Sequence, residues 1–214
     1  MCGRFTADRE VFEEVEKLVG SLDGMELRTG DFCPSQEILI LTGTGIPAGT
    51  AEGEDGEKRR FSPRKAVWGY PGRDRGRLLF NARTETVEER PTFRRDFARR
   101  RCAVAAGGFY EWNTGKEKFL FTGDGPVLYL AGIYAGDPGR ERACILTVPA
   151  EGTVRPVHER MPLILSGEEL EEWIRGRKGA ECYWKRRQPD LKREKCGGEY
   201  GQLSLFDGGQ DGLL

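Results

Sequence analysis

Closely spaced apolar runs in the second half of the chain constrain the fold more than any other feature. Six strand-like runs follow one another and are mostly joined by Gly, Asp and Pro turns: Cys102–Ala106, Phe109–Trp112, Lys118–Thr122, Val127–Tyr134, Cys144–Val148 and Met161–Leu165. Connections this short favour antiparallel pairing over strands joined by crossover helices. The spacing therefore predicts a curled, partly barrel-like antiparallel sheet.

Short helices flank this sheet in the predicted fold. Apolar residues recur at helical spacing over residues 8–20, after a cap at Thr6 or Asp8, and again from about Gly167 to Arg175. The polar stretch Thr84–Arg99 is expected to hold one or two short helices. Three further extended runs complete the set: Ile38–Leu41, Phe61–Tyr70 and Leu78–Phe80. The fold class is therefore predicted as α+β.

The chain of 214 residues suits one domain followed by a tail. After Tyr183 the composition turns to Lys, Arg, Gly and Gln, so we expect a catalytic domain over 1–185 and a mobile tail over 186–214. No segment approaches a membrane span, and the start of the chain lacks the apolar core of a secretory signal. We expect a cytosolic protein with no membrane partner. A monomer is expected because no coiled-coil seam appears.

Cysteine spacing gives no indication of a metal site. The six cysteines form no C-x-x-C pair, and a single histidine accompanies them. Most of these thiols are interpreted as small core residues, since disulfides are rare in cytosolic proteins. We expect no metal and no cofactor.

Charge is distributed unevenly although the net charge is only −1. The stretch Arg90–Arg101 carries six arginines and a single acid, Asp96. This pattern fits either a basic face for nucleic acid or an ordinary solvated helix face.

Cys2 is exceptional because of its position. Removal of Met1 would leave it with a free α-amine and a thiol on adjacent carbons. An aldehyde reacts with such a pair twice, first as an imine with the amine and then by ring closure of the sulfur to a thiazolidine. Reference pKa values of about 8 for the amine and about 8.5 for the thiol put both groups within reach of neutral pH. Cys2 is thus a candidate covalent nucleophile.

Three other positions are candidates for chemistry, each with an ordinary structural alternative. His158, the single histidine, lies in a loop before an apolar strand and suits proton transfer, or it is a surface or capping residue. Glu111 lies between two aromatic residues, where desolvation would raise its pKa for acid–base work, or it stands at the rim of ordinary aromatic packing. Asn81 ends a strand and is suited to hold the amine of Cys2, or it caps a helix.

Taken together, four separated motifs resemble the SRAP family, the SOS-response-associated peptidase or abasic-site-processing proteins. The matching segments are Met1–Phe5, Asn81–Thr86, Arg101–Cys102 with Gly108–Trp112, and His158–Pro162, and the resemblance spans roughly residues 1–185. The sequence departs from the family pattern at two places. The usual second tryptophan is missing after Trp68-Gly69-Tyr70, and Ala105-Ala106-Gly107 replaces Pro-Ala-x.

The resemblance implies covalent capture of abasic sites in single-stranded DNA through Cys2. It implies that Asn81 orients the N-terminus, that Glu111 handles protons, and that His158 assists opening of the sugar ring and reversal of the adduct. The peptidase activity in the family name would be the release of Met1. A lyase-type activity is expected in addition. The residues expected to contact DNA are Arg4, Arg83 and Arg160 at phosphates, Pro34 and Trp68 near the damaged nucleotide, and Trp112 as a stacking surface.

A pentapeptide in the tail resembles a bacterial sliding-clamp-binding motif. Its candidate clamp contacts are Gln202, Leu203, Leu205 and Phe206, within a region otherwise rich in Gly and Asp. The alternative is a disordered tail with chance leucines. If the motif binds a clamp, the protein would be delivered to replication forks at the nucleoid.

Two other functions remain open from the sequence. An N-terminal-nucleophile glutamine amidotransferase also begins Met-Cys-Gly, although the later motifs have no place in it. A non-covalent single-strand binding module would use the Arg90–Arg101 cluster and the tryptophans.

Overall fold

The computed structural model describes residues 2–44, 60–73, 76–137, 139–176 and 180–197. Its helices are α1 (Arg9–Val19), α2 (Pro91–Arg99), α3 (Gly167–Arg175) and α4 (Glu181–Lys185). Its strands are β1 (Phe5–Ala7), β2 (Gly30–Phe32), β3 (Glu37–Gly43), β4 (Phe61–Trp68), β5 (Tyr70–Pro71), β6 (Leu78–Leu79), β7 (Asn81–Arg83), β8 (Arg101–Ala106), β9 (Gly108–Trp112), β10 (Lys118–Thr122), β11 (Leu128–Ala135), β12 (Arg142–Pro149), β13 (Arg160–Pro162), β14 (Ile164–Leu165) and β15 (Lys192–Lys195).

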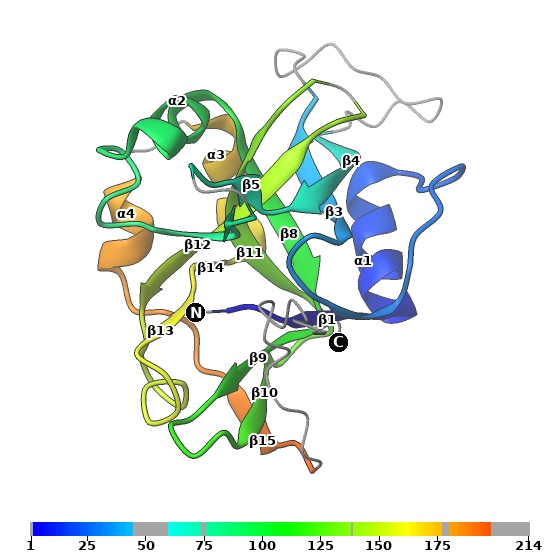
Figure 1. Ribbon diagram of the computed structural model, residues 1–214. Helices are drawn as coiled ribbons and strands as arrows, with labels where there is room; N and C mark the ends of the chain where they lie inside the picture. The colour runs from blue at the N-terminus through cyan, green and yellow to red at the C-terminus, as the bar shows by residue number, and fades with distance from the viewer. Residues whose placement is uncertain (1, 45–59, 74–75, 138, 177–179, 198–214) are drawn as a thin grey trace, which may run out of the picture.

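An eight-stranded sheet forms the larger layer. Its strand order is β13-β12-β4-β3-β8-β11-β14, with β7 added beside β12. Because β11 also pairs with β12, the sheet curls back on itself and is partly closed. The predicted fold of strands with a few short helices is confirmed, and the helices lie around the strands (Figure 1).

The prediction of purely antiparallel pairing is wrong for one strand. β12 runs parallel to β4 and to β7, although it forms an antiparallel pair with its chain neighbour β11. Short turns pair β9 with β10 and β11 with β12, whereas β8 and β9 lie in different sheets. Turn spacing does not fix how a strand meets partners from the first half of the chain.

A five-stranded antiparallel sheet forms the smaller layer, in the order β15-β10-β9-β1-β2. It brings the first strand of the chain next to β9, with Phe5 opposite Phe109. Figure 1 shows β1 above β9, β10 and β15, on the side of the smaller sheet toward the larger one. The core between them is aromatic, since Phe5 stacks on Phe32 and packs against Trp68.

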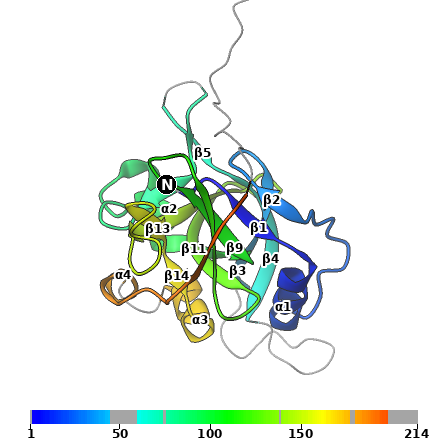
Figure 2. The same ribbon diagram turned by 90° about the horizontal axis from the view of Figure 1, so that it is seen from below.

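Local capping signals set the helix boundaries. The Asp8 side chain accepts a hydrogen bond from the Val11 amide and begins α1, whereas Thr6 belongs to β1. Ser166 and Glu169 form a reciprocal capping box at the start of α3, and Gly176 ends that helix in the left-handed conformation. Viewed from below, α1 lies on one side of the strands and α3 and α4 on the other (Figure 2). Among the described helices, none is long and apolar enough to cross a membrane.

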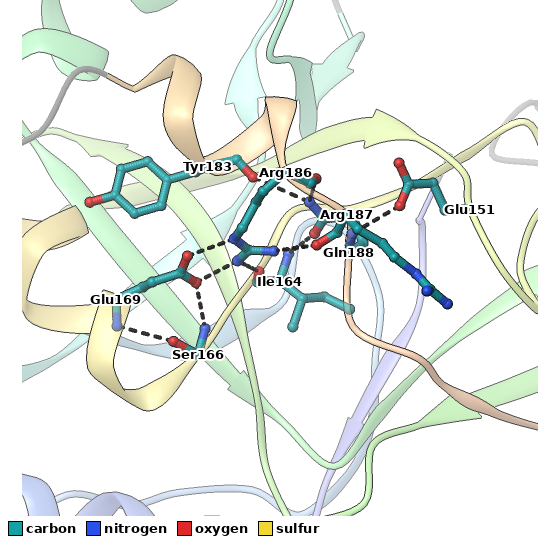
Figure 3. A network of polar contacts seen from close by, with 8 residues as sticks. All are labelled: Glu151, Ile164, Ser166, Glu169, Tyr183, Arg186, Arg187 and Gln188. Atoms are coloured by element: carbon teal, nitrogen blue, oxygen red, sulfur yellow. Dashed lines mark hydrogen bonds and ion pairs between the residues drawn. The ribbon is translucent and has the colours of Figure 1, made fainter.

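The folded domain extends beyond the boundary predicted at residue 185. Gln188 is buried, and β15 pairs in register with β10, Leu120 lying opposite Glu194. The Arg186 guanidinium binds the Glu169 carboxylate and the Ile164 carbonyl, which anchors the start of this segment (Figure 3). The basic composition of residues 186–197 therefore reflects an exposed edge strand and its anchor, rather than a tail.

Candidate functional site

Cys2 lies at the centre of the site. Its side chain is completely buried, directly before β1, and its thiol donates a long hydrogen bond to the Arg4 carbonyl. The Asn81 amide, at the start of β7, donates a 2.7 Å hydrogen bond to the Cys2 carbonyl. Asn81 Oδ1 is also buried and accepts no hydrogen bond within the described part of the chain. The sequence led us to expect Asn81 at the Cys2 amine, whereas the hydrogen bond in the structure goes to the Cys2 carbonyl.

Glu111 reaches the same place from β9, the strand that pairs with β1. Its side chain is only 3% exposed. Burial disfavours the charged carboxylate and raises the pKa of Glu111 to about 7. A group with this pKa can both donate and accept a proton near neutral pH.

His158 completes the group from the loop between β12 and β13. Its Nδ1 lies 4.0 Å from Glu111 Oε1 and accepts a 2.9 Å hydrogen bond from the Arg160 amide. Burial lowers the pKa of His158, which favours the neutral ring. Glu111 and His158 are therefore neighbours, at a distance longer than a direct hydrogen bond.

The Cys2 thiol is held in its protonated form by this environment. Desolvation raises its pKa well above the ordinary range, and the nearby Glu111 carboxylate adds to the effect. A thiolate is the reactive form, so attack by Cys2 requires a base at hand. Glu111 is the carboxylate next to it.

The expected phosphate contact of Arg160 is not supported by its position. The guanidinium is 8% exposed and binds both carboxylate oxygens of Glu85, at 2.5 and 2.9 Å. It also donates to the Thr147 carbonyl at 2.6 Å. A bidentate ion pair and a backbone contact occupy this side chain, so it supports the loop of His158 instead of facing solvent.

Trp68 is also placed differently from the expectation. Its side chain has no exposed surface, and its indole donates to the Phe80 carbonyl at 2.9 Å. Stacking on a nucleotide needs a free ring face, and the faces of Trp68 pack against core aromatics. Pro34 is half-buried in the neighbouring turn, whose Ser35 amide binds the Trp68 carbonyl.

The remaining candidates for DNA contact lie nearer the surface. Arg83 is exposed and has no ion pair within the described residues. Trp112 is half-buried, with the Arg4 guanidinium 5.7 Å from its ring centroid. Arg4 is also paired with Asp31 at 3.7 Å.

Sequence reasoning gave no role to several residues that organise this site. Glu85 was part of a recognised motif, but its partner is 75 positions away. Lys118 lies 3.8 Å from the Tyr110 ring centroid and shares Asp31 with Arg4. Strand register could have linked Lys118 to Trp112, since the two are opposite in the β9–β10 hairpin. Of the predicted site residues, Gln202, Leu203, Leu205 and Phe206 lie outside the described residues.

Comparisons with known proteins agree on one family. The family model described as SOS response associated peptidase (SRAP) matches residues 1–192. The abasic site processing protein YoqW of Bacillus subtilis is 30% identical over 196 residues, covering 81% of this chain and 80% of that protein. The abasic site processing protein YedK of Escherichia coli is 29% identical over 192 residues, covering 82% and 80%.

Solved structures show the same fold. A crystal structure of a protein from Bordetella bronchiseptica superposes with a TM-score of 0.71 at 21% identity, covering 92% of this chain and 100% of the other. One from Bacteroides thetaiotaomicron gives 0.69 at 19% identity, covering 91% of each. The chain belongs to the SRAP family.

Proposed function

We propose that this protein captures abasic sites in single-stranded DNA covalently, using Cys2 after removal of Met1. The observation that carries the proposal is the convergence of a buried thiol, a carboxyl group with a pKa of about 7 and an imidazole around residue 2. These groups come from three separate parts of the chain. Relatives named abasic site processing proteins support the choice of substrate.

The reaction balances with the loss of one water. The α-amine of Cys2 adds to the aldehyde carbon of the ring-opened sugar, and loss of water gives an imine. The sulfur then adds to the imine carbon while a proton moves to the nitrogen, which closes the thiazolidine. The amine and the thiol of one residue thus both bond to the same carbon.

Glu111 would serve both steps. In its acid form it protonates the departing hydroxyl group, and the resulting carboxylate takes the proton of the Cys2 thiol. Asn81, which already fixes the Cys2 carbonyl, has a buried oxygen suited to receive an N–H of the free amine. His158 would assist opening of the sugar ring and, in the reverse direction, release of the adduct in a lyase-type reaction.

Phosphate contacts in this proposal fall to Arg83 and to the exposed edge of Arg4. Trp112, next to Arg4, would offer its edge to an unpaired base. No role at the DNA is proposed for Trp68 or Arg160, because both are buried.

Denaturing gel electrophoresis tests this function. The protein is incubated with single-stranded DNA that contains one abasic site, beside intact DNA and the Cys2→Ser variant. We expect a band that resists denaturation only with the unchanged protein and abasic DNA. If no band forms although mass spectrometry shows that Met1 is absent, the covalent reaction is refuted.

Release of Met1 is proposed as an autocatalytic hydrolysis at the same site. Water is added across the Met1–Cys2 peptide bond, which yields free methionine and the Cys2 amine. Cell-free synthesis with methionine aminopeptidase inhibited tests this step. The unchanged protein should lose Met1, and Glu111→Gln should retain it; retention by both would refute the proposal.

The segment Gln202–Phe206 is proposed to bind the replication sliding clamp, on the strength of its sequence pattern. The protein would then act as a cytoplasmic monomer at replication forks during the response to DNA damage. A truncation after Gly201 should abolish clamp binding and leave crosslinking intact. Unchanged clamp affinity would refute this part.

A further inference from the structure

Glu111 and His158 lie close together but are carried by different sheets. Glu111 belongs to β9 of the five-stranded sheet. His158 belongs to the loop 150–159, which connects β12 and β13 of the eight-stranded sheet. Their separation of 4.0 Å therefore depends on how one sheet is held against the other.

The loop of His158 has little regular structure of its own. Turn hydrogen bonds join Val154 to Glu151 and His158 to Val154, at 3.1 and 3.0 Å. Two apolar side chains, Val154 and Val157, anchor it in the core. Its outer part, where Glu151 and Thr153 lie, is exposed and needs support from another element.

The segment Arg186–Lys195 supplies that support, and we call it the clasp. The backbone N–H of Gln188 donates a 2.9 Å hydrogen bond to the Glu151 carboxylate. The Thr153 hydroxyl donates to the Leu191 carbonyl at 2.8 Å. The Gln188 side chain is buried and accepts a hydrogen bond from the Ile164 amide. Figure 3 shows Glu151 reaching toward this segment while Arg186 is held by Glu169.

The other end of the clasp supports Glu111. Its last residues form β15, in which Lys195 lies opposite Phe119 of β10. Phe119 lies in turn opposite Glu111 of β9. One continuous segment thus contacts the loop of His158 at its start and extends the sheet of Glu111 at its end.

We propose that the clasp is a positioning element that holds His158 against Glu111 by tying the loop 150–159 to the five-stranded sheet. The inference deepens the proposed function and rests on it, because it assigns to both groups a part in the reaction at Cys2. Gln188 of the clasp and Thr153 of the loop are the positioning residues, since their hydrogen bonds join the two segments to each other.

The test removes a single contact at the exposed side of the loop. Thr153→Val deletes the hydroxyl that binds the Leu191 carbonyl, and Thr153→Ser keeps it. Arg187→Ala is the matched control in the clasp, because that side chain is exposed and its one ion pair among the described residues is with Asp190, within the segment. Glu151→Ala is a second, independent variant at the other contact.

The single histidine of the chain gives a direct spectroscopic readout. Its ring signal in NMR reports the titration of His158 without overlap, even in the absence of DNA. The charged groups that act on the ring are the N-terminal amine, which lowers its pKa, Glu111 from β9, and Glu159 and Arg160 from its own loop and β13. We expect Thr153→Val and Glu151→Ala to move the His158 titration toward its ordinary value as the ring gains water, while Thr153→Ser and Arg187→Ala leave it unchanged.

The reaction gives the second readout. At saturating abasic DNA the maximal crosslinking rate should fall about tenfold in Thr153→Val and Glu151→Ala. The DNA concentration at half-maximal rate should stay unchanged, and Thr153→Ser should restore the rate. If the titration and the maximal rate are unchanged in both variants, the clasp has no positioning role. If the unchanged protein forms no adduct, the proposed function fails, while the NMR measurement still decides whether the clasp positions His158.

Discussion

Two glutamates near His158 have opposite environments. Partial burial of Glu85 acts to raise its pKa, but hydrogen bonds from the Arg160 guanidinium prevail and the pKa is lowered. Glu111 is almost completely buried beside a thiol and an imidazole, and its pKa rises to about 7. The comparison shows that the partner, and not the residue type, decides which carboxyl group holds structure and which can move protons.

The largest expected effect comes from exchanging each carboxyl group for an amide. Glu111→Gln should slow crosslinking between about a hundredfold and ten-thousandfold, because an amide can neither give nor take the proton. Glu85→Gln should change the rate far less, since its carboxylate does not face Cys2. Single-turnover rates on abasic single-stranded DNA measure both variants, and equal losses would remove the distinction.

The pH dependence of stability should have opposite signs for the two groups. Glu111 has a pKa of about 7 when folded against an ordinary 4.5, so its contribution is fully present below pH 4.5 and is lost as the pH rises through 7. The pKa of Glu85 is lowered, so its contribution is present above 4.5 and is lost as the pH falls through its folded pKa.

Urea unfolding of the two amide variants at both ends of this range measures the difference. Relative to the unchanged protein, Glu111→Gln should gain up to about 3 kcal/mol between pH 4.5 and a pH above 7. Glu85→Gln should be less stable than the unchanged protein only at pH values above the pKa that Glu85 has in the folded protein. A parallel pH dependence for Glu111→Gln and the unchanged protein would contradict the raised pKa.

Arg160→Met tests the structural side of the comparison. The substitution leaves the Thr147 carbonyl without its donor and frees a carboxylate that is 42% exposed and can turn to water. We expect a loss of about 2 kcal/mol in the free energy of unfolding, less than for a fully buried pair. Arg160→Lys should not restore it, because an ammonium group cannot bind both oxygens in the same way. An unchanged midpoint in urea would count against the ion pair.

The smallest expected effect is on DNA binding and distinguishes an exposed arginine, Arg83, from a buried one, Arg160. Arg83→Ala should weaken binding of single-stranded DNA about fivefold and reduce the slope of log affinity against log salt by about 0.7. Arg160→Met should leave that slope unchanged, since its guanidinium faces Glu85. Fluorescence anisotropy over a salt series measures the slopes, and a reduced slope for Arg160→Met would show that this side chain reaches a phosphate.

Local signals in the sequence were sufficient for much of the fold. The helix predicted from Gly167 to Arg175 has those bounds because Ser166 and Gly176 provide its caps. The six strand-like runs after residue 101 all contain strands, since their alternation and turns act over short distances. Motif resemblance indicated that Asn81 acts at the Cys2 amine, and the structure places the Asn81 amide next to Cys2, at its carbonyl.

Long-range partners were beyond the reach of the sequence. An arginine in a motif looks the same whether it faces a phosphate or, as Arg160 does, a glutamate 75 positions away. Trp68 was expected near the damaged nucleotide, but a neighbouring carbonyl satisfies its indole and allows complete burial. The charged strand Lys192–Lys195 was interpreted as tail because all four of its residues are exposed and only its backbone is paired.

The order of strands in the smaller sheet has a consequence for biosynthesis. Its second strand from one edge, β1, is made first, and its opposite edge, β15, is made after residue 191. The pairing of β1 with β9 joins Phe5 to Phe109. Contacts between residues so far apart in sequence slow the search for the native state. A ribosome-bound chain therefore carries Cys2 before β9 and β15 have been made, and the five-stranded sheet is complete only after synthesis has passed residue 195.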